Sequence, residues 1–224
     1  MRHGSPSPGV VGSELIRLLA GLARAPAAGA PAPVFAERLG GWLDWTGAIA
    51  LAGALAATPA GAAAAAPPAQ PASELAEAER ACERAHAALA ATIAGGALAQ
   101  RPADADDFAP YRRHARACQQ AMHDGVAVLR QRLRDALARH SARGARLAAI
   151  DAVLDRGLAA RERFLLERIV TQLQAHHERL RRAADAGWQA AYTAEMQRVL
   201  RAELAHRMGP ARGLLDALRQ METR

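Results

Sequence analysis

A helical periodicity that extends over most of the C-terminal half is the feature that most limits how this chain can fold. From Asp107 to Met208, apolar side chains recur every three or four positions, with interruptions only at residues 141–144 and 185–187. This spacing places the apolar side chains on one face of a helix, and no segment alternates as a strand would. The pattern therefore predicts an all-α fold built from long helices.

The apolar stripes predict an elongated antiparallel helical bundle with coiled-coil-like long helices. One stripe covers residues 111–137, a second covers residues 147–180 in one helix, and a third covers residues 188–208. Their steps of three and four residues fit a period of 3.6 better than a strict heptad, which favours antiparallel packing over a long supercoil. The residues expected in the core are Leu129, Leu133, Leu154, Leu165, Leu173 and Leu200.

The N-terminal part of the chain is divided by two stretches rich in proline and alanine. Residues 1–12 are predicted to be a disordered lead-in, and residues 13–57 to be an N-terminal helical hairpin that begins with Ser13 as an N-cap. Residues 58–72 have neither charge nor large apolar side chains, so they are predicted to be a mobile linker. Residues 73–224 then form the long-helix bundle, with Ser73 as its first N-cap.

The charge is concentrated in the bundle. Residues 109–224 contain 22 of the 29 basic residues, all of which are arginine, against 12 acidic residues. A basic region of this kind can bind nucleic acid or another polyanion. Many of these arginines have an acid one helical turn away, as Arg207 has Glu203, and such pairs are ordinary on the surface of a soluble helix. Polyanion binding is therefore the alternative rather than the leading hypothesis.

Neither a membrane span nor a secretory signal is predicted. The longest stretch without charge lies between Asp44 and Glu74, but it is mostly alanine and glycine and is interrupted by proline. Residues 1–12 lack the apolar core of a signal peptide. We therefore expect a cytoplasmic protein.

Two cysteines and two histidines form the sharpest local pattern. Cys82 and His86 are four residues apart, as are His114 and Cys118, so each pair shares one helical face. If the two helices fold back antiparallel about residue 100, the four side chains could converge on a tetrahedral zinc ion. Plain packing is the interpretation we favour, because the spacing is unlike common zinc sites and flanking arginines would repel a dication. No metal or cofactor is therefore predicted.

No catalytic motif accompanies the helices. The chain has no nucleophile elbow, P-loop or dinucleotide fingerprint, so it is not expected to be an enzyme. Only 4% of the residues are aromatic, and these are expected to anchor the core or contact a partner. We therefore predict a non-enzymatic interaction or assembly protein that binds a protein partner or a second copy of itself. The interaction candidates are Phe35, Trp42, Trp45 and Trp188.

Several helix segments also carry a resemblance to a known family. They include SELIRLLAGL, VFAERLGGWLDWTGAIALAGAL, DFAPYRRHARACQQAM and LAAIDAVLDRGLAARERFLL, together with the segment from Trp188 to Gln220. Through them the chain resembles the proteobacterial family called domain of unknown function 3348. Members of that family look to be encoded beside membrane proteins similar to flagellar-stator or energy-transducing channel subunits. The resemblance implies no activity, but it implies an accessory role at an envelope-associated machine, peripheral at the inner membrane.

Overall fold

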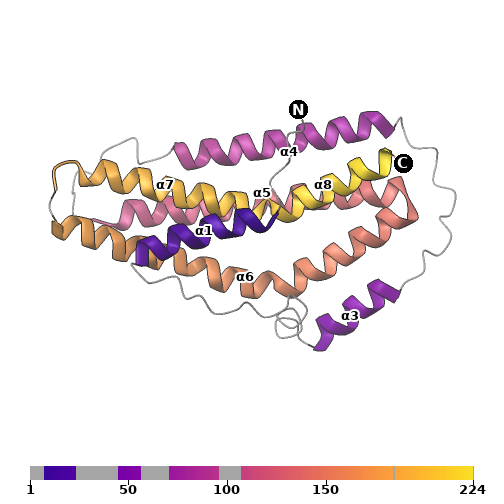
Figure 1. Ribbon diagram of the computed structural model, residues 1–224, viewed down its shortest axis with the longest axis horizontal. Coiled ribbons are helices and arrows are strands. Elements are labelled where there is room, and N and C mark those ends of the chain that lie inside the picture. The colour runs from indigo at the N-terminus through magenta and orange to yellow at the C-terminus, as the bar shows by residue number, and fades with distance from the viewer. Residues whose placement is uncertain (1–7, 24–44, 57–70, 96–106, 184, 224) are drawn as a thin grey trace. The chain divides into compact units, whose positions relative to one another are not determined.

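The computed structural model describes residues 8–23, 45–56, 71–95, 107–183 and 185–223, and each regular element within these ranges is an α-helix. The prediction of an all-α fold is confirmed (Figure 1). The helices are α1 (Pro8–Ala23), α3 (Trp45–Ala56), α4 (Pro71–Ala94), α5 (Ala109–His140), α6 (Ala142–Ala183), α7 (Trp188–Arg207) and α8 (Gly209–Glu222).

Polar side chains define where the two longest helices begin. The Asp107 carboxylate accepts a hydrogen bond from the backbone N–H of Ala109 at 2.7 Å, which satisfies one of the free donors at the start of α5. Between α5 and α6 only Ser141 is non-helical, and its hydroxyl accepts from the N–H of Gly144 at 3.0 Å. The predicted interruption at residues 141–144 is thus a one-residue turn. The helix predicted across residues 147–180 is confirmed as part of the 42-residue α6.

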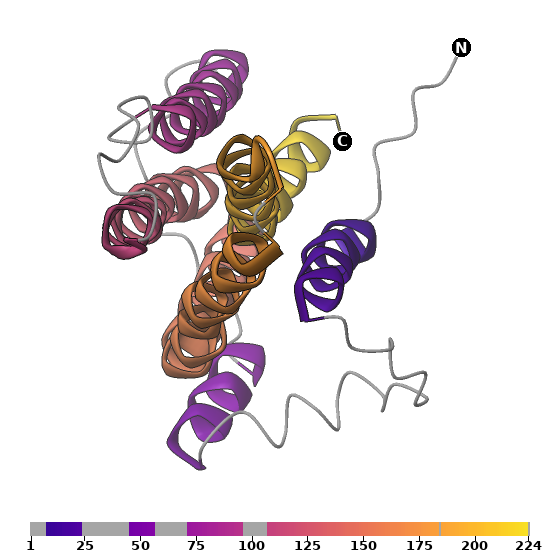
Figure 2. The same ribbon diagram turned by 90° about the vertical axis from the view of Figure 1, so that its left-hand side faces the viewer.

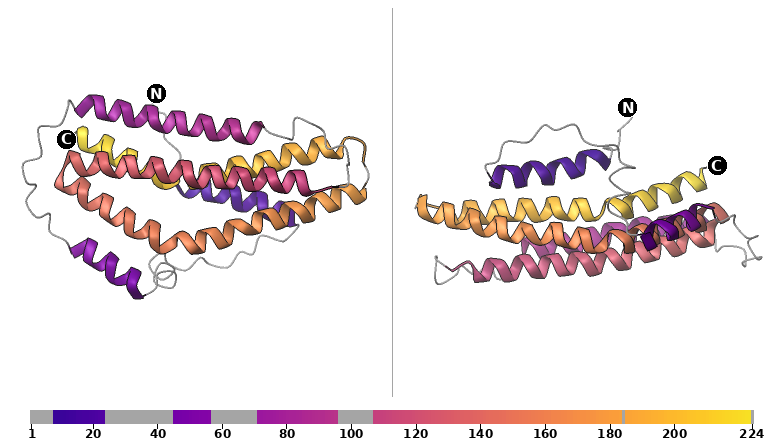
Figure 3. Two further views of the ribbon diagram at one scale, coloured as in Figure 1. Left: turned by 180° about the vertical axis from the view of Figure 1, so that it is seen from behind. Right: turned by 90° about the horizontal axis from the view of Figure 1, so that it is seen from below.

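Gly144 is required for this short turn. A Cβ atom at Gly144 would lie 2.0 Å from the carbonyl oxygen of Leu137, far inside van der Waals contact. The absence of a side chain therefore lets the first turn of α6 approach the last turns of α5, and the α5–α6 hairpin is visible from behind in Figure 3.

The interruption predicted at residues 185–187 lies between α6 and α7. Gly187 precedes α7 in a left-handed conformation with φ of 85°, which glycine adopts without the strain of a Cβ atom. The third predicted stripe, residues 188–208, ends where α7 ends, and only Met208 separates α7 from α8. Pro210 lies in the first turn of α8, where its missing N–H costs no hydrogen bond.

The chain is organised in two compact units, each assembled from three stretches of sequence. Unit 1 comprises residues 1–28, 86–125 and 166–209, and unit 2 comprises residues 29–85, 126–165 and 210–224. Within the described residues, unit 1 therefore contains α1, α7 and parts of α4, α5 and α6. Unit 2 contains α3, α8 and the other parts of α4, α5 and α6.

Unit 1 has a core of aliphatic and aromatic side chains. Helix α1 lies against α7 and buries Leu15 and Leu22, and Figure 2 shows the helical segments of this unit nearly end-on. Its most deeply buried apolar side chains are Ile93, Tyr111, Ala115, Cys118, Met122, Ile169, Leu173, Tyr192, Met196, Val199, Leu200, Leu204 and Met208.

Unit 2 has a core in which leucine predominates. Its buried apolar side chains come from α4, from the second half of α5, from the first half of α6 and from α8. They are Ala78, Cys82, Val126, Leu129, Leu133, Ala136, Leu137, Ala148, Val153, Ala211, Leu214, Leu215 and Leu218.

The predicted core is correct on α5 and α7 and partly wrong on α6. Leu129, Leu133, Leu173 and Leu200 are buried, and every residue of the stripe predicted across 111–137 is buried. Leu154 is only half-buried, and Leu165 is 48% exposed. The next residue, Leu166, is buried at 6% exposure, because the face of a straight helix drifts by about 20° for every seven residues.

The predicted domains differ from the observed packing. Helix α1 begins at Pro8, so residues 8–12 of the predicted lead-in are helical and Ser13 is not its N-cap. The predicted hairpin of residues 13–57 does not form one unit, since α1 belongs to unit 1 and α3 to unit 2. A physical reason is that α1 can bury leucines against the longer α7, whereas α3 is short and offers little surface.

The predicted boundary at the linker and the single bundle also need correction. Most of the predicted linker of residues 58–72 lies outside the described residues, and α4 already begins at Pro71, so Ser73 is not its N-cap. The bundle predicted for residues 73–224 is divided between the two units, because one part of each long helix packs in a core with α1 and α7 and the other part packs in a core with α8.

Candidate functional site

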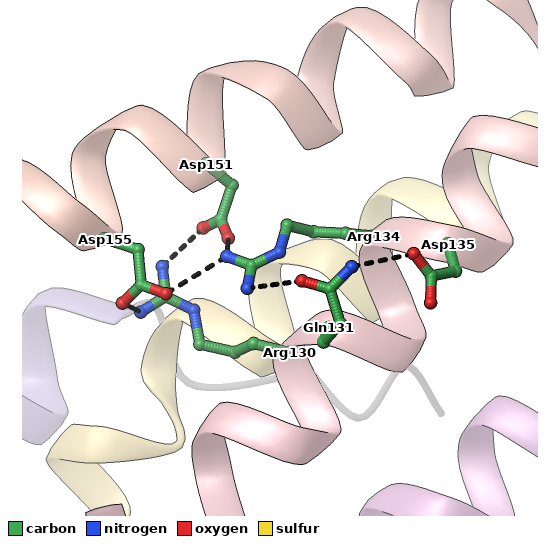
Figure 4. A network of polar contacts seen from close by, with 6 residues as sticks. All are labelled: Arg130, Gln131, Arg134, Asp135, Asp151 and Asp155. Carbon is green, nitrogen blue, oxygen red and sulfur yellow. Dashed lines mark hydrogen bonds and ion pairs between the residues drawn. The ribbon is translucent and has the colours of Figure 1, made fainter.

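A network of four ion pairs joins α5 and α6 within unit 2 (Figure 4). Arg130 binds Asp151 at 2.7 Å and Asp155 at 2.5 Å, while Arg134 binds the same two carboxylates at 3.0 and 3.1 Å. Three of the four side chains are only 10–12% exposed, and Asp155 is 33% exposed. Two positive and two negative charges therefore balance one another inside the unit.

The spacing of the network explains why it fixes how α5 and α6 pair. The arginines are four residues apart on α5 and the aspartates are four residues apart on α6, so each pair projects from one helical face. If one helix slid past the other, some of these poorly exposed charges would lose their partners, which would lower the stability of the fold. Because guanidinium groups occupy both carboxylates, this cluster is better suited to a structural role than to acid–base chemistry.

Unit 1 contains a histidine enclosed by aromatic rings. His177 is 1% exposed, and its ring centroid lies between 5.1 and 5.4 Å from those of Phe108, Tyr111, Trp188 and Tyr192. Trp188, a predicted interaction candidate, is half-buried and packs edge-on against this histidine. Trp188 therefore contributes to the interior of unit 1. Burial raises the pKa of the Tyr192 hydroxyl well above its usual value, with a smaller contribution from Tyr111.

The neighbouring His176 belongs to a polar chain that reaches α1. Arg179 donates a hydrogen bond to His176 Nδ1 at 3.0 Å, which leaves Nε2 as the nitrogen that donates to the Glu195 carboxylate. The same guanidinium donates to the backbone carbonyl of Leu22 near the end of α1. These contacts attach α1 to the rest of unit 1, and no sequence motif indicated them.

The structure brings together only half of the predicted cysteine–histidine cluster. Cys118 Sγ lies 3.5 Å from His114 Nε2, and the two side chains contact the carbonyl oxygens of Thr92 and Ile93 at 3.8 and 3.3 Å. Thr92 is ten residues beyond Cys82 in the sequence, so the pairing of α4 with α5 about residue 100 is wrong. Among the described residues, no group of three cysteine, histidine or acidic side chains is arranged to hold a metal ion.

Apolar packing explains the shifted register. Ile93 is completely buried, and a Leu89 methyl group lies 3.5 Å from the position that a Cβ atom on Gly125 would occupy. These larger side chains gain more from burial than cysteine does, so they determine which parts of α4 and α5 meet. Cys82 is buried as a free thiol in unit 2, and His86 is exposed.

The Cys118 thiol should be unreactive in the folded protein. Burial, with a smaller effect of the Glu203 carboxylate, raises the pKa of Cys118 to about 11. Since only the thiolate attacks, its fraction at pH 8 should be roughly 100-fold below that of an unfolded cysteine. We expect a Cys82→Ser variant to react slowly with an aromatic disulfide reagent at pH 8 and rapidly once it is unfolded in denaturant. Fast labelling of the folded variant would contradict this prediction.

The same raised pKa predicts a loss of stability at alkaline pH. The folded state holds the Cys118 proton more tightly than the unfolded state, whose thiol has its usual pKa. The resulting contribution to stability is complete below the unfolded pKa and is lost as the pH rises towards about 11. A Cys118→Ala variant should show a weaker decrease in stability over this alkaline range.

Glu203 is a buried charge that the sequence alone placed on the surface. It is 0% exposed, accepts hydrogen bonds from Arg207 at 2.8–2.9 Å, and accepts another from Gln119 at 3.1 Å. Gln119 also donates to the carbonyl oxygen of Leu166. The pair at positions 203 and 207 was thus correctly recognised, but its burial depends on helices that are distant in sequence.

Large apolar side chains are exposed mainly in unit 2. Among the described residues with such side chains, Ile16 belongs to unit 1, and all the others belong to unit 2. Those in unit 2 are Trp45 (81%), Ile49 (56%), Leu55 (48%), Val128 (55%), Phe164 (64%) and Leu165 (48%). Of the predicted interaction candidates, Trp45 is therefore exposed, whereas Phe35 and Trp42 lie outside the described residues.

Over the described residues, the fold and these clusters define a class: an all-α bundle protein with ion pairs buried among its helices and with most of its exposed large apolar side chains in unit 2. Residues 1–220 match the model of a family described as "Protein of unknown function (DUF3348)", so the chain belongs to that family. No curated protein and no solved structure gives a match. In the part of the chain that the structure describes, no helix combines the length and the apolar character needed to cross a membrane.

Proposed function

We propose that this protein is a non-enzymatic interaction or assembly protein that binds a protein partner through Phe164 and Leu165 on α6. The observation that carries this proposal is that two large adjacent apolar side chains are 64% and 48% exposed in the middle of a long helix. The chain has only three phenylalanines, and an exposed Phe164 leaves in water one of the few large aromatic side chains that could have been buried.

The residues around Phe164 have the composition of a protein interface. The three preceding residues are Arg161, Glu162 and Arg163, and all three are charged. Apolar side chains at the centre of a contact with charged groups at its rim are typical of a surface that binds another protein reversibly. The rigid helix would present both apolar side chains with little loss of backbone entropy on binding.

The buried titratable groups support a non-enzymatic role. Asp151 and Asp155 are occupied by guanidinium groups, and the Cys118 thiol is held in its protonated form by burial. A thiol that burial keeps protonated is a poor nucleophile, and carboxylates that are ion-paired with guanidinium groups are poor proton acceptors.

The resemblance stated for the sequence suggests the kind of partner. We propose a subunit of an envelope-associated machine, approached from the cytoplasmic side of the inner membrane. Self-association through the same residues is the competing outcome. Binding of nucleic acid is the second competing outcome. It can be distinguished from binding of a protein because charge-driven binding weakens steeply as the salt concentration is raised, whereas apolar contact does not.

Replacement of Phe164 by glutamate tests this proposal. We expect the tagged Phe164→Glu variant, purified from the native host after mild detergent extraction and nuclease treatment, to lose the partner that the unchanged protein retains. The matched control is Val128→Glu, which places the same charge at a 55% exposed position on α5 of the same unit and should retain the partner. Equal recovery with both variants, or recovery that depends on undigested nucleic acid, would refute the proposal.

A further inference from the structure

Helix α3 differs in chemistry from the surface around Phe164. Its twelve residues, WTGAIALAGALA, contain no charge, and none of them is buried. Trp45 at its first position is 81% exposed, and Ile49 and Leu55 are 56% and 48% exposed. A surface that binds a soluble protein normally has a charged or polar rim, whereas this helix has no charged side chain, and Thr46 and the indole N–H of Trp45 are its polar side-chain groups. Tryptophan and aliphatic residues in a helix are typical of the membrane–water interface.

Two exposed arginines lie one turn apart on α6, and one of them contacts this helix. Arg146 of α6 donates a hydrogen bond to the backbone carbonyl of Leu55, in the last turn of α3, where a cation is favoured by the helix dipole. Arg143 lies one turn earlier on α6, and both arginines are exposed. Residues 142–150 contain no acidic side chain, so this end of α6 is cationic.

A hollow adjoins the same arginines. It has a volume of about 330 Å³, and Arg143 and Arg146 line it together with Leu147, Ile150 and Met221. Cationic groups next to apolar groups match the chemistry of a phospholipid, in which an anionic headgroup adjoins an acyl chain.

We propose that α3 and the Arg143–Arg146 pair form a site through which unit 2 binds the surface of an anionic phospholipid bilayer. The apolar side chains of α3 enter the boundary between headgroups and acyl chains, and the two guanidinium groups bind phosphate. A helix of twelve residues is about 18 Å long. It is too short to cross a hydrocarbon core of about 30 Å, so it lies in the plane of the interface.

The apolar helix α3 next to two arginines suits a bilayer better than it suits nucleic acid or a second copy of the chain. Nucleic acid would bind the arginines but would leave Trp45 and Ile49 in water. In a symmetric dimer the same patch is used on both copies, so two cationic patches would come close together and repel. An anionic bilayer satisfies the apolar and the cationic parts at once. This inference goes beyond the proposed function, because it concerns a different surface and a different class of partner.

Vesicle binding of the full chain tests the inference directly. The probe is a Trp42→Phe, Trp188→Phe variant, in which Trp45 is the sole tryptophan. We expect it to sediment with vesicles that contain phosphatidylglycerol and not with vesicles of phosphatidylcholine alone. Its fluorescence should shift to shorter wavelength and be quenched by acyl chains brominated near the headgroup. Equal binding to both vesicle types, or a Trp45 that is not quenched, would overturn the proposal.

Point variants separate the two parts of the site. Ile49→Glu should weaken vesicle binding by more than about tenfold, since it places a charge in the apolar face. The Arg143→Gln, Arg146→Gln double variant should weaken binding to anionic vesicles by about fivefold for each arginine. The matched control is Ile16→Glu, at a 68% exposed apolar position in unit 1, and it should bind as the unchanged protein does.

Two further outcomes would overturn the membrane site. One is an equal loss of binding in Ile16→Glu, and the other is a dimer of the unchanged protein that Ile49→Glu dissociates in analytical ultracentrifugation. Circular dichroism shows whether each variant is folded. Phe164→Glu should retain vesicle binding while it loses its protein partner, so failure of this inference and failure of the proposed function give different results.

Discussion

Replacement of Asp151 by alanine is expected to lower the free energy of unfolding by about 3–5 kcal/mol. The variant leaves Arg130 and Arg134 with Asp155 as the remaining carboxylate of the network in Figure 4. Both arginines are only 10–12% exposed, and their Nε atoms are buried without a hydrogen-bond partner among the described residues. An excess of positive charge at so little exposure cannot be well solvated. Chemical denaturation monitored by circular dichroism measures the effect.

An exposed ion pair provides the matched control for this prediction. Asp216 and Arg219 are 59% and 46% exposed and 2.9 Å apart on α8 of the same unit. Asp216→Ala should change the free energy of unfolding by less than about 1 kcal/mol, because water screens the pair. If the two aspartate variants lose equal stability, the network does not differ from a surface ion pair.

Replacing the whole network separates stability from pairing specificity. A variant with leucine or methionine at all four positions should recover most of the lost stability, since apolar groups of similar size avoid the desolvation of charge. In this variant we expect α5 and α6 to pair in more than one register. Exchange between the registers would broaden the amide resonances of both helices. A variant that stays as unstable as Asp151→Ala would contradict this account.

The second large effect is expected for Gly144→Ala, which should cost about 3 kcal/mol. The added Cβ atom would lie 2.0 Å from the carbonyl oxygen of Leu137, and the atom that must move is backbone. Relief of this clash requires α5 and α6 to separate at the one-residue turn, which disturbs the contacts of the buried Leu137. Thermal unfolding of the Gly144→Ala variant and of the unchanged protein measures the difference in stability.

Gly213→Ala is the matched control in a helix of the same unit. No atom lies within 4 Å of the position of its added Cβ atom, and Gly213 is exposed within α8. Alanine is the better helix former, so this variant should be more stable by about 0.5–1 kcal/mol. A loss of stability in both glycine variants would show that the clash at Gly144 is not the cause.

The sequence predicts the helices well because their signals are local. Side chains on the stripe of α5 repeat at the helical period, and Asp107 and Ser141 accept hydrogen bonds from the helix starts that follow them. Such interactions connect residues that are close in the chain, so they can be recognised before the fold is known.

The contacts between helices are much harder to predict, because they depend on residues far apart in the chain. The same periodicity that identifies α4 and α5 is compatible with several registers, and the register with Cys82 beside Cys118 is not the one that buries Ile93. The sequence likewise gave no sign that Arg130 would bind Asp155, or that Glu203 would be buried beside Gln119. Of the interaction candidates, Trp45 is exposed, whereas Trp188 encloses His177 in the interior.

The division of the long helices between two units limits how this protein can be dissected. Helices α4, α5 and α6 each contribute residues to both units, and each unit draws on three separate stretches of chain. No single cleavage or truncation therefore releases either unit as a contiguous fragment. Deletion of a shared helix to remove one unit also removes residues that the other unit needs to fold. Genetic mapping by truncation would report loss of folding as if it were loss of a binding site. Full-length proteins with single substitutions are the reagents that can assign a role to either unit.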